Sequence, residues 1–398
     1  MIVKPLIELS KKISSGLTPL RSNPEFWDNG TIPWLKTEQL GEKYIYETNE
    51  HISEVALEKT AIRLFPVNSL SIAMYGEGKT RGNLSILKKS MATNQACCNV
   101  EIDSDKADYE YVYYFLKTQY DELRQLSSGV RKNLNSNDIK NYPIRLPSSL
   151  DEQRKIACVL KVLDDKIALN NRINAELEAM AKTLYDYWFV QFDFPDANGK
   201  PYKTSGGKME YNATLKREVP VGWKIKKISE IALVKAGGDK PSNCVDFRSD
   251  EYSIPIFSNG ISSEGLYGYT NISVVNKPSI TVSARGTIGY SVLRLKPFFP
   301  IIRLLVLTPY QDNALKFLEE TIKRFSFENS GSVQQQLTVP QISEMSILYP
   351  IEKLLNIYTK RIWPLIKKIE LIKEQNSELQ QLRDWLLPLL MNGQVTIK

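Results

Sequence analysis

The sequence repeats itself at an offset of about 200 residues, and this duplication limits the folds open to the chain. SSGVRKNLNSNDIKNYPIRLP (127–147) has a counterpart in NSGSVQQQLTVPQISEMSILYP (329–350). Both run from Ser-Gly through a polar stretch to a Leu, an Ile and a closing Pro, so that Leu134 matches Leu337. Solenoid repeats are much shorter, at roughly 20 to 50 residues. The duplication therefore predicts two similar domains.

The repeated parts carry the patterns of sheet-based domains. Short apolar or alternating runs such as LSIAM, LSIL, SITVS and YSVLRL predict strands, and Gly- and Asn-rich turns separate them. Residues 109–126 and 314–325 predict shorter helices. We expect an α+β fold whose polar loops project from one side of each domain. Two further pairs of matching segments are 31–40 with 253–262, and 69–87 with 278–295.

A long helix is expected after each repeat. Residues 151–190 contain no Gly or Pro, and apolar positions recur there in alternating steps of four and three, as in a coiled-coil heptad. Residues 352–391 repeat the pattern, although Pro364 should kink or break the start of the second helix. The predicted seam comprises Ile156, Leu160, Leu163, Ile167, Asn170, Asn174, Leu177, Ala181, Leu184 and Trp188, then Leu365, Ile369, Ile372, Asn376, Leu379 and Leu386.

Two asparagines, Asn174 and Asn376, fall at equivalent positions of the two seams. A buried Asn at such a position lowers stability but fixes the register and the number of partners. The alternative is a solvated Asn on a frayed stripe. The chain is thus expected to alternate two globular domains with two long helices that pack as an antiparallel coiled coil. Its predicted parts are a globular domain (1–150), a long helix (151–192), a linker (193–217), a second globular domain (218–350), a second long helix (351–391) and a tail (392–398).

The stretch AMYGEGKT (73–80) matches a loose form of the phosphate-binding P-loop. A P-loop needs a helix after it, but Arg81-Gly82-Asn83 is a poor helix start and strand-like alternation follows. The equivalent SARGTIGYS (283–291) keeps the glycine frame and has no lysine in the place of Lys79. We therefore expect a strand–loop–strand in both halves and no nucleotide site.

Composition argues for a polyanionic partner and against several kinds of site. The net charge of +7 favours a partner such as DNA. With His51 as the only histidine and four cysteines without CxxC spacing, a zinc site or a disulfide framework has little to build on. No apolar run is long enough to span a membrane and the N-terminus lacks a signal-peptide core, which favours a cytoplasmic protein without membrane contact.

Catalytic motifs are weak or absent. Glu77-Gly78-Lys79 and Asp138-Ile139-Lys140 fit the D/E-x-K fragment of metal-dependent nucleases, but 45 acids and 52 bases make such matches expected by chance. The Asn/Asp-Pro-Pro-Tyr/Phe motif of a DNA methyltransferase does not occur. We expect no catalytic residue, metal site or cofactor in this chain.

The polar turns instead suit DNA. Arg and Lys can bind guanine, Asn and Gln can bind adenine, and Ser, Thr and Lys can hold phosphates. The two halves share a turn frame but differ in the polar residues it carries, which suits a bipartite, asymmetric target; ordinary solvated loops are the alternative. The candidate DNA-binding residues are Lys36, Lys79, Thr80, Arg81, Arg131, Lys132 and Asn133 in the first half, and Ser258, Asn259, Arg285, Thr287, Gln334, Gln335 and Gln336 in the second.

The stretch LPSSLDEQRKIACVLKVLDDKI (146–167), followed by LYDYWFVQFDF (184–194), resembles the specificity subunit of type I restriction–modification systems. The alternation of domains and helices, with a Ser-Gly turn before each helix, is similar to that family over essentially the whole chain. The second half departs from the pattern, because YPIEKLLNIYTKRIWPLI (349–366) lacks the Glu-Gln-x-x-Ile signature.

The resemblance implies two target recognition domains, each reading one half of a split site in double-stranded DNA. The paired helices would be a spacer and a docking platform for two modification subunits, which hold S-adenosylmethionine and methylate adenine. Restriction subunits with ATP- and Mg-dependent translocase activity would complete the complex. Tyr185, Trp188 and Phe189 would then lie near helix or partner packing, or be plain domain core. The alternatives are a coiled-coil scaffold without a DNA role and a single-chain restriction enzyme with an unrecognised motif.

Overall fold

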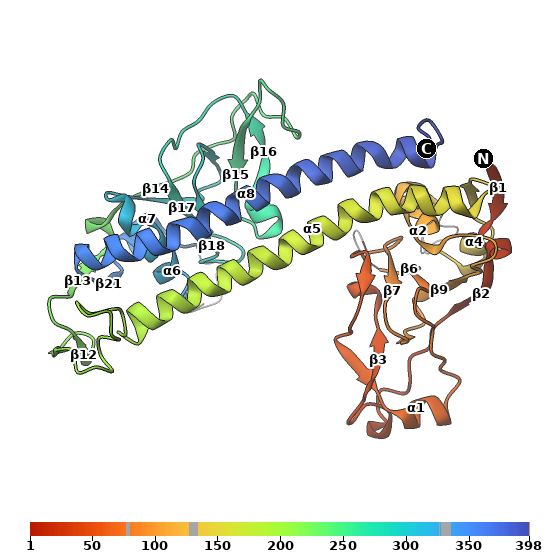
Figure 1. Cartoon of the computed structure of the whole chain (residues 1–398), viewed down its shortest axis with the longest axis horizontal. Helices are drawn as coiled ribbons and strands as arrows, with labels where there is room; N and C mark the ends of the chain where they lie inside the picture. Colours follow the sequence, from red (N-terminus) through yellow and green to blue (C-terminus); the bar gives the residue numbers. More distant parts are fainter. Residues whose placement is uncertain (77–79, 127–133, 326, 328–335, 398) are drawn as a thin grey trace. The chain divides into compact units, whose positions relative to one another are not determined.

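The computed structural model describes residues 1–76, 80–126, 134–325, 327 and 336–397. These residues form two compact units (Figure 1). Unit 1 comprises Met1–Asn170 and Glu374–Lys398, and unit 2 comprises Asn171–Lys373. Each unit contains a sheet-based domain together with part of each of two long helices. The expected α+β class, with two similar domains and two long helices, is confirmed.

Unit 1 is built on a five-stranded sheet of order β2-β9-β6-β7-β4, antiparallel except for the β4–β7 pair. A smaller sheet of order β5-β3-β8 and the β1–β10 pair complete its strands. The strands are β1 (Ile2–Pro5), β2 (Ser10–Ser15), β3 (Ile32–Leu35), β4 (Tyr44–Ile45), β5 (Glu50–Ile52), β6 (Leu70–Ala73), β7 (Leu84–Leu87), β8 (Ala92–Thr93), β9 (Cys97–Ile102) and β10 (Pro143–Leu146). Its shorter helices are α1 (Glu54–Lys59), α2 (Tyr109–Thr118), α3 (Tyr120–Gln125) and α4 (Ser136–Lys140), with short turns η1 (Leu6–Leu9), η2 (Pro24–Phe26) and η3 (Thr37–Gln39).

Unit 2 repeats this plan with a four-stranded sheet of order β14-β20-β17-β18 and a smaller sheet of order β16-β15-β19. The β13–β21 pair takes the place of β1–β10, and the β11–β12 hairpin is extra. The strands are β11 (Met209–Asn212), β12 (Arg217–Pro220), β13 (Lys224–Lys227), β14 (Ala232–Ala236), β15 (Ile254–Phe257), β16 (Leu266–Thr270), β17 (Ser279–Val282), β18 (Ser291–Arg294), β19 (Phe299–Pro300), β20 (Leu305–Pro309) and β21 (Ser346–Tyr349). The helices are α6 (Leu315–Ile322) and α7 (Val339–Glu344), with short turns η4 (Asp186–Val190), η5 (Ile228–Glu230), η6 (Ser262–Gly265) and η7 (Asp312–Ala314).

One backbone hydrogen bond demonstrates the duplication at residue level. In unit 1 the Leu134 amide donates to the Met74 carbonyl at 3.2 Å, and in unit 2 the Leu337 amide donates to the Ala284 carbonyl at 2.9 Å. The match of Leu134 with Leu337 therefore holds in space. It also makes Met74 equivalent to Ala284.

The core of unit 1 explains why its strand sequences are so apolar. All four residues of β6 and all four of β7 are buried, and α2 contributes Tyr111, Val112 and Leu116 to the same core. A strand covered on both faces needs a continuous apolar run rather than alternation. LSIA and LSIL come close to that requirement, because each has a single serine, Ser71 or Ser85, among apolar residues.

The two long helices, α5 (Leu150–Tyr185) and α8 (Glu352–Met391), run antiparallel within each unit. In unit 1, Arg383 donates to Asp164 at 3.0 Å, and Asn170 donates to Asn376 at 2.8 Å. In unit 2, Asn174 donates to the Ile369 carbonyl at 3.5 Å. Within unit 1, the partner number in α8 falls as the number in α5 rises. The seam positions Ile156, Leu160, Ile167, Asn174, Ile369, Ile372 and Asn376 are buried, while Leu163, Leu177, Leu184, Leu365, Leu379 and Leu386 are half-buried.

Pro364 does not break α8, which continues through it from Glu352 to Met391. The proline is exposed, whereas Ile362 and Ile366 on either side of it are buried. Packing of this apolar face offsets the hydrogen bond that proline cannot donate.

The Glu-Gln-Arg-Lys-Ile signature has a structural role in unit 1. Gln153 is only 1% exposed; its Nε2 donates to the Pro147 carbonyl at 2.8 Å, and its Oε1 accepts from the Asp108 amide at 2.9 Å. Ile156 is buried in the same core. This glutamine therefore joins the start of α5 to the domain that precedes it.

The segment expected to be a linker is a folded part of unit 2. Phe194 stacks on Tyr202 with ring centroids 4.6 Å apart and on Trp223 at 5.8 Å. The aromatic end of α5 belongs to the same core, because Trp188 and Phe189 are 2% and 4% exposed. The cluster is thus domain core, and it also packs on the second long helix, because the Phe189 and Tyr358 rings lie 4.8 Å apart.

Candidate nucleic-acid interface

The glycine-framed turn joins adjacent antiparallel strands in both units. The Gly82 amide donates to the Ala73 carbonyl at 2.9 Å, and the Gly289 amide donates to the Ser283 carbonyl at the same distance. Both closing glycines have φ near +85°, at 86° and 84°. Strand β7, and not a helix, follows AMYGEGKT, so the helix N-terminus that a P-loop needs is missing. The expected strand–loop–strand is confirmed.

Three loops of unit 2 are joined by one side chain, that of Asn259. Its Nδ2 donates to the Ile302 carbonyl at 2.6 Å, and its Oδ1 accepts from the Ala284 amide at 2.7 Å. Both ends of the amide are thus engaged within the protein, which makes Asn259 a positioning residue for its neighbours. The adjacent Ser258 amide donates to the Gly265 carbonyl at 2.8 Å and closes the loop after β15.

Arg285 and Gln336, both candidates from the sequence, lie together although they are 51 residues apart. Gln336 Oε1 accepts from Arg285 Nε at 3.2 Å and from Nη2 at 2.8 Å. Arg285 and Thr287 are exposed at the tip of the β17–β18 turn. The structure therefore presents a guanidinium to solvent with its orientation fixed by a neighbour.

The sequence pattern did not predict a further residue of this surface, Arg303. Ile302 and Arg303 both have positive φ, at 53° and 59°, and both are exposed. Their amides donate to the carbonyls of Gly238 and Gly237 at 2.9 and 3.1 Å. A β-branched residue in this conformation is strained, and such strain persists where the surroundings enforce it, often at functional sites. A general preference for glycine at positive φ gave no signal at this Ile-Arg pair.

The unit 1 candidates have partners inside the protein. Lys36 pairs with Glu38 at 2.8 Å and with Glu50 at 2.6 Å, and these contacts raise the pKa of Lys36. Arg81 is half-buried and donates to the Arg124 carbonyl at 3.3 Å, while Thr80 is half-buried beside it. The candidates Lys79, Arg131, Lys132, Asn133, Gln334 and Gln335 lie outside the described residues.

The residue equivalent to Arg285 in unit 1 is Tyr75, because each follows the carbonyl that binds the matched leucine. Tyr75 is 40% exposed. One scaffold therefore presents a phenol in unit 1 and a guanidinium in unit 2. The two surfaces have different hydrogen-bonding chemistry.

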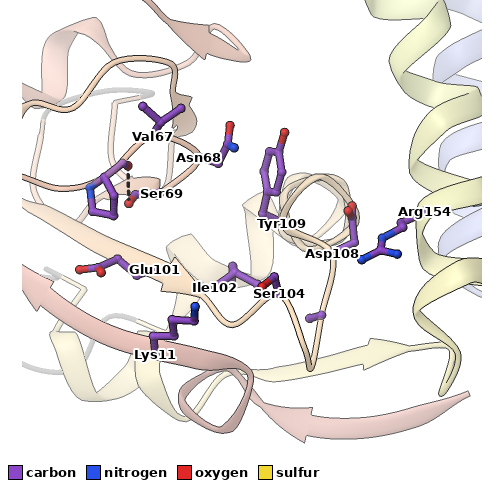
Figure 2. A pocket seen from close by; sticks show the side chains of 12 residues that line it. Lys11, Val67, Asn68, Ser69, Glu101, Ile102, Ser104, Asp108, Tyr109 and Arg154 are labelled. Carbon is purple, nitrogen blue, oxygen red and sulfur yellow. Dashed lines mark hydrogen bonds between the residues drawn. The ribbon is translucent and has the colours of Figure 1, made fainter.

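Unit 1 also contains a hollow of about 500 Å³ between β2, β9 and the start of α5 (Figure 2). Its acids already have structural partners: Glu101 pairs with Arg63, and Asp108 accepts from the Tyr111 amide at 2.9 Å as the cap of α2. Burial raises the pKa of Asp108. These contacts explain Glu101 and Asp108 as structural residues. The two acids do not form a catalytic pair.

Among the described residues, no group of three or more His, Cys, Asp or Glu side chains could hold a metal ion. Within the same residues, no helix is long and apolar enough to cross a membrane.

The fold is thus that of a chain with two similar α+β domains, each attached to a pair of antiparallel helices. The family described as "Type I restriction modification DNA specificity domain" matches residues 3–179 and 220–381, once in each half. The chain belongs to this family.

Individual relatives cover nearly the whole chain. The type I restriction enzyme MjaIX specificity subunit of Methanocaldococcus jannaschii is 26% identical, over 97% of this chain and 92% of the relative. A putative type I specificity subunit of Mycoplasma pneumoniae is 26% identical over 73% of this chain and 76% of the relative. The crystal structure of a type I restriction–modification S subunit from M. genitalium has the same fold, with a TM-score of 0.61, 18% identity, and coverage of 98% of this chain and 95% of that one.

Proposed function

We propose that this chain is the DNA sequence-specificity subunit of a type I restriction–modification complex, and that it binds a bipartite, asymmetric site in double-stranded DNA. The observation that carries the proposal is the pair of equivalent turns with Tyr75 on one and Arg285 on the other. Major-groove readout depends on the donors and acceptors that a protein presents. Two equivalent scaffolds with different tips would read two different half-sites.

The long helices would dock two modification subunits. Within unit 1 they expose apolar side chains, notably Val162 at 59% and Trp385 at 63%. Exposed apolar side chains on paired helices suit packing against partner helices. Restriction/translocase subunits would join the same complex.

The chemistry would reside on the partners. We assign S-adenosylmethionine to the modification subunits and ATP with Mg to the restriction subunits, and no cofactor or catalytic role to this chain. We propose a cytoplasmic location, because the complex would act on cellular DNA.

The test is to co-express the chain with its modification subunit and to sequence the host DNA for methyladenine. The expected result is a motif of two specified blocks separated by an unspecified spacer. Methylation at a continuous motif would contradict the bipartite reading. The purified chain alone should neither cleave nor methylate DNA, and activity of the chain alone would favour a single-chain enzyme. DNA binding by the assembled complex should weaken with salt, and absent or salt-insensitive binding would favour a scaffold.

A further inference from the structure

We propose that Arg285, held by Gln336, reads a guanine in the half-site bound by unit 2, and that Arg303 contacts a phosphate beside it. This inference rests on the proposed function, because it assigns a base to one of the two half-sites. It concerns described residues of three loops in unit 2, after β15, between β17 and β18, and between β19 and β20, together with Gln336, which precedes α7.

The geometry of the Arg285 guanidinium carries the first step. The group has five N–H donors in a fixed plane. Gln336 Oε1 accepts one from Nε at 3.2 Å and one from Nη2 at 2.8 Å, so it occupies the side of the fork formed by these two nitrogens. The edge formed by Nη1 and Nη2 keeps one N–H on each nitrogen that does not face Gln336. Two parallel donors match the O6 and N7 acceptors of guanine in the major groove.

Gln336 matters because it fixes the plane of those donors before DNA arrives. A free arginine side chain loses rotamer entropy when it is immobilised on a base. An arginine already held by two hydrogen bonds to a neighbouring amide oxygen has lost part of that freedom. Gln336 is therefore a positioning residue, and Arg285 is the residue that contacts the base.

Asn259 places the second cation. It bonds the Ala284 amide and the Ile302 carbonyl at 2.7 and 2.6 Å, so the residues that follow, Arg285 and Arg303, flank one asparagine. Arg303 has a positive φ, and its backbone N–H donates a hydrogen bond to the Gly237 carbonyl. Together they fix the direction in which the Arg303 side chain leaves the backbone. An exposed arginine next to a base-reading residue suits a phosphate contact, which sets register without reading sequence.

The position equivalent to Arg285 in unit 1 cannot make the same contact. Tyr75 replaces Arg285, and a single phenol cannot present two parallel donors. The inference is therefore confined to one half-site.

The experiment uses the complex of the full chain with its modification subunit and maps methyladenine for wild type and for Arg285→Ala, Arg285→Lys, Gln336→Ala and Arg303→Ala. We expect a guanine in one half-site of the wild-type motif. Arg285→Ala should reduce discrimination at that base by roughly 5- to 150-fold, the range of one bidentate contact, and leave the other half-site unchanged. Arg285→Lys keeps a cation that can still bind guanine but lacks the planar fork, so it should reduce discrimination less than Arg285→Ala does. Gln336→Ala should also have a smaller effect at the same base.

Arg303→Ala should weaken DNA binding to all sequences alike. It should also reduce by about one the slope of the logarithm of the binding constant against the logarithm of the salt concentration. Arg217→Ala, on the β11–β12 hairpin, is the matched control for the loss of one exposed charge from unit 2 and should leave the motif unchanged. If the wild-type motif is bipartite but Arg285→Ala and Arg285→Lys leave every base preference intact, or lower methylation uniformly, the guanine assignment is wrong and the proposed function stands. If the wild type has no split motif, the proposed function fails.

Discussion

The Asn170 side-chain nitrogen lies 2.8 Å from the Asn376 side-chain oxygen, inside the helix seam of unit 1. The same nitrogen lies 2.9 Å from Gln375 Oε1. Asn174 of α5 is matched with Asn376 of α8 in the sequence pattern. It donates instead to the Ile369 carbonyl in unit 2. Buried amides with specific partners permit only one alignment of the two helices. The register of the pair is therefore set by hydrogen bonds as well as by apolar packing.

Replacing one member of this pair should destabilise unit 1. Asn376→Leu removes an acceptor of the buried Asn170 amide, and a buried polar group that loses a partner costs about 1 to 3 kcal/mol. The double variant Asn170→Leu/Asn376→Leu removes both amides and should recover most of that loss. Urea unfolding followed by circular dichroism measures both. A double variant less stable than either single variant would show that the pair contributes more than mutual satisfaction.

A buried ion pair should matter more than an exposed one in the same unit. Lys43 lies 2.7 Å from Glu110, their side chains are 10% and 6% exposed, and Lys43 also donates to the Tyr114 hydroxyl. Lys43→Met leaves the acid without its cation and should cost about 3 to 5 kcal/mol. The control is Lys89→Met, whose pair with Glu47 is about half exposed and should contribute far less, because solvent screens exposed charges. Equal losses for the two variants would contradict this account.

The two glycines of the β17–β18 turn should respond differently to alanine. Both have positive φ, which costs a non-glycine residue about 1 to 2 kcal/mol. A Cβ on Gly286 meets nothing within 4 Å, whereas a Cβ on Gly289 would lie 2.2 Å from the Phe327 ring. Gly286→Ala should therefore lower the midpoint of thermal unfolding by about 2 to 8 °C, and Gly289→Ala by clearly more. Similar midpoints for both variants would mean that the ring moves away at little cost.

Acid should weaken the attachment of Glu264 to α8. Burial would raise the pKa of Glu264, but Lys373 at 2.6 Å and Arg294 at 3.1 Å outweigh burial and lower it below its ordinary value of 4.5. A carboxyl whose folded pKa is lowered stabilises the fold above its unfolded pKa, and this stabilisation is lost as the pH falls through the folded value.

Glu264→Gln should consequently unfold at lower urea than wild type at pH 7, and the difference should shrink below pH 4.5. The exposed Glu251 serves as the control, because Glu251→Gln should change little at either pH. A difference that stays constant from neutral to acid pH would show that the charge of Glu264 does not stabilise unit 2.

The four cysteines should react with alkylating reagents in the order of their burial. Burial raises the pKa of Cys97 to about 12 and that of Cys98 to about 11, whereas Cys158 is exposed on α5. The thiolate is the reactive form, so Cys97 and Cys98 should label only after unfolding. Mass spectrometry of the native chain at pH 8 should find Cys158 labelled first. Early labelling of Cys97 or Cys98 would indicate local opening of β9.

The repeat could be predicted from the sequence because it depends on residues that are close together in the chain. Leu134 and Leu337 occupy the same hydrogen-bonded position, and LSIL is a strand over Leu84–Leu87 as its composition predicts. The glycine that closes the turn is Gly82, which repeats as Gly289. Glycine at positive φ is a sequence signal that survives folding.

The rest of the site depends on contacts between distant segments. Nothing local links Arg285 to Gln336 or Asn259 to Ile302, and the strained Ile302–Arg303 turn runs against the usual preference for glycine. The predicted break of α8 at Pro364 was wrong for a similar reason, because helix packing outweighs a local preference. Residues that read a ligand are set by such long-range placement, which a pattern in one segment does not contain.

Binding of the assembled complex to duplexes in which one of the two specified sequence blocks is scrambled at a time shows whether each unit reads one half of a split site. Affinity should fall for either scramble, by about 1 to 3 kcal/mol for each specified base pair, and the two losses should add in the duplex with both blocks scrambled. All duplexes should keep the same non-specific, salt-dependent binding. If scrambling one block leaves the affinity unchanged, only one unit reads DNA and the account is wrong.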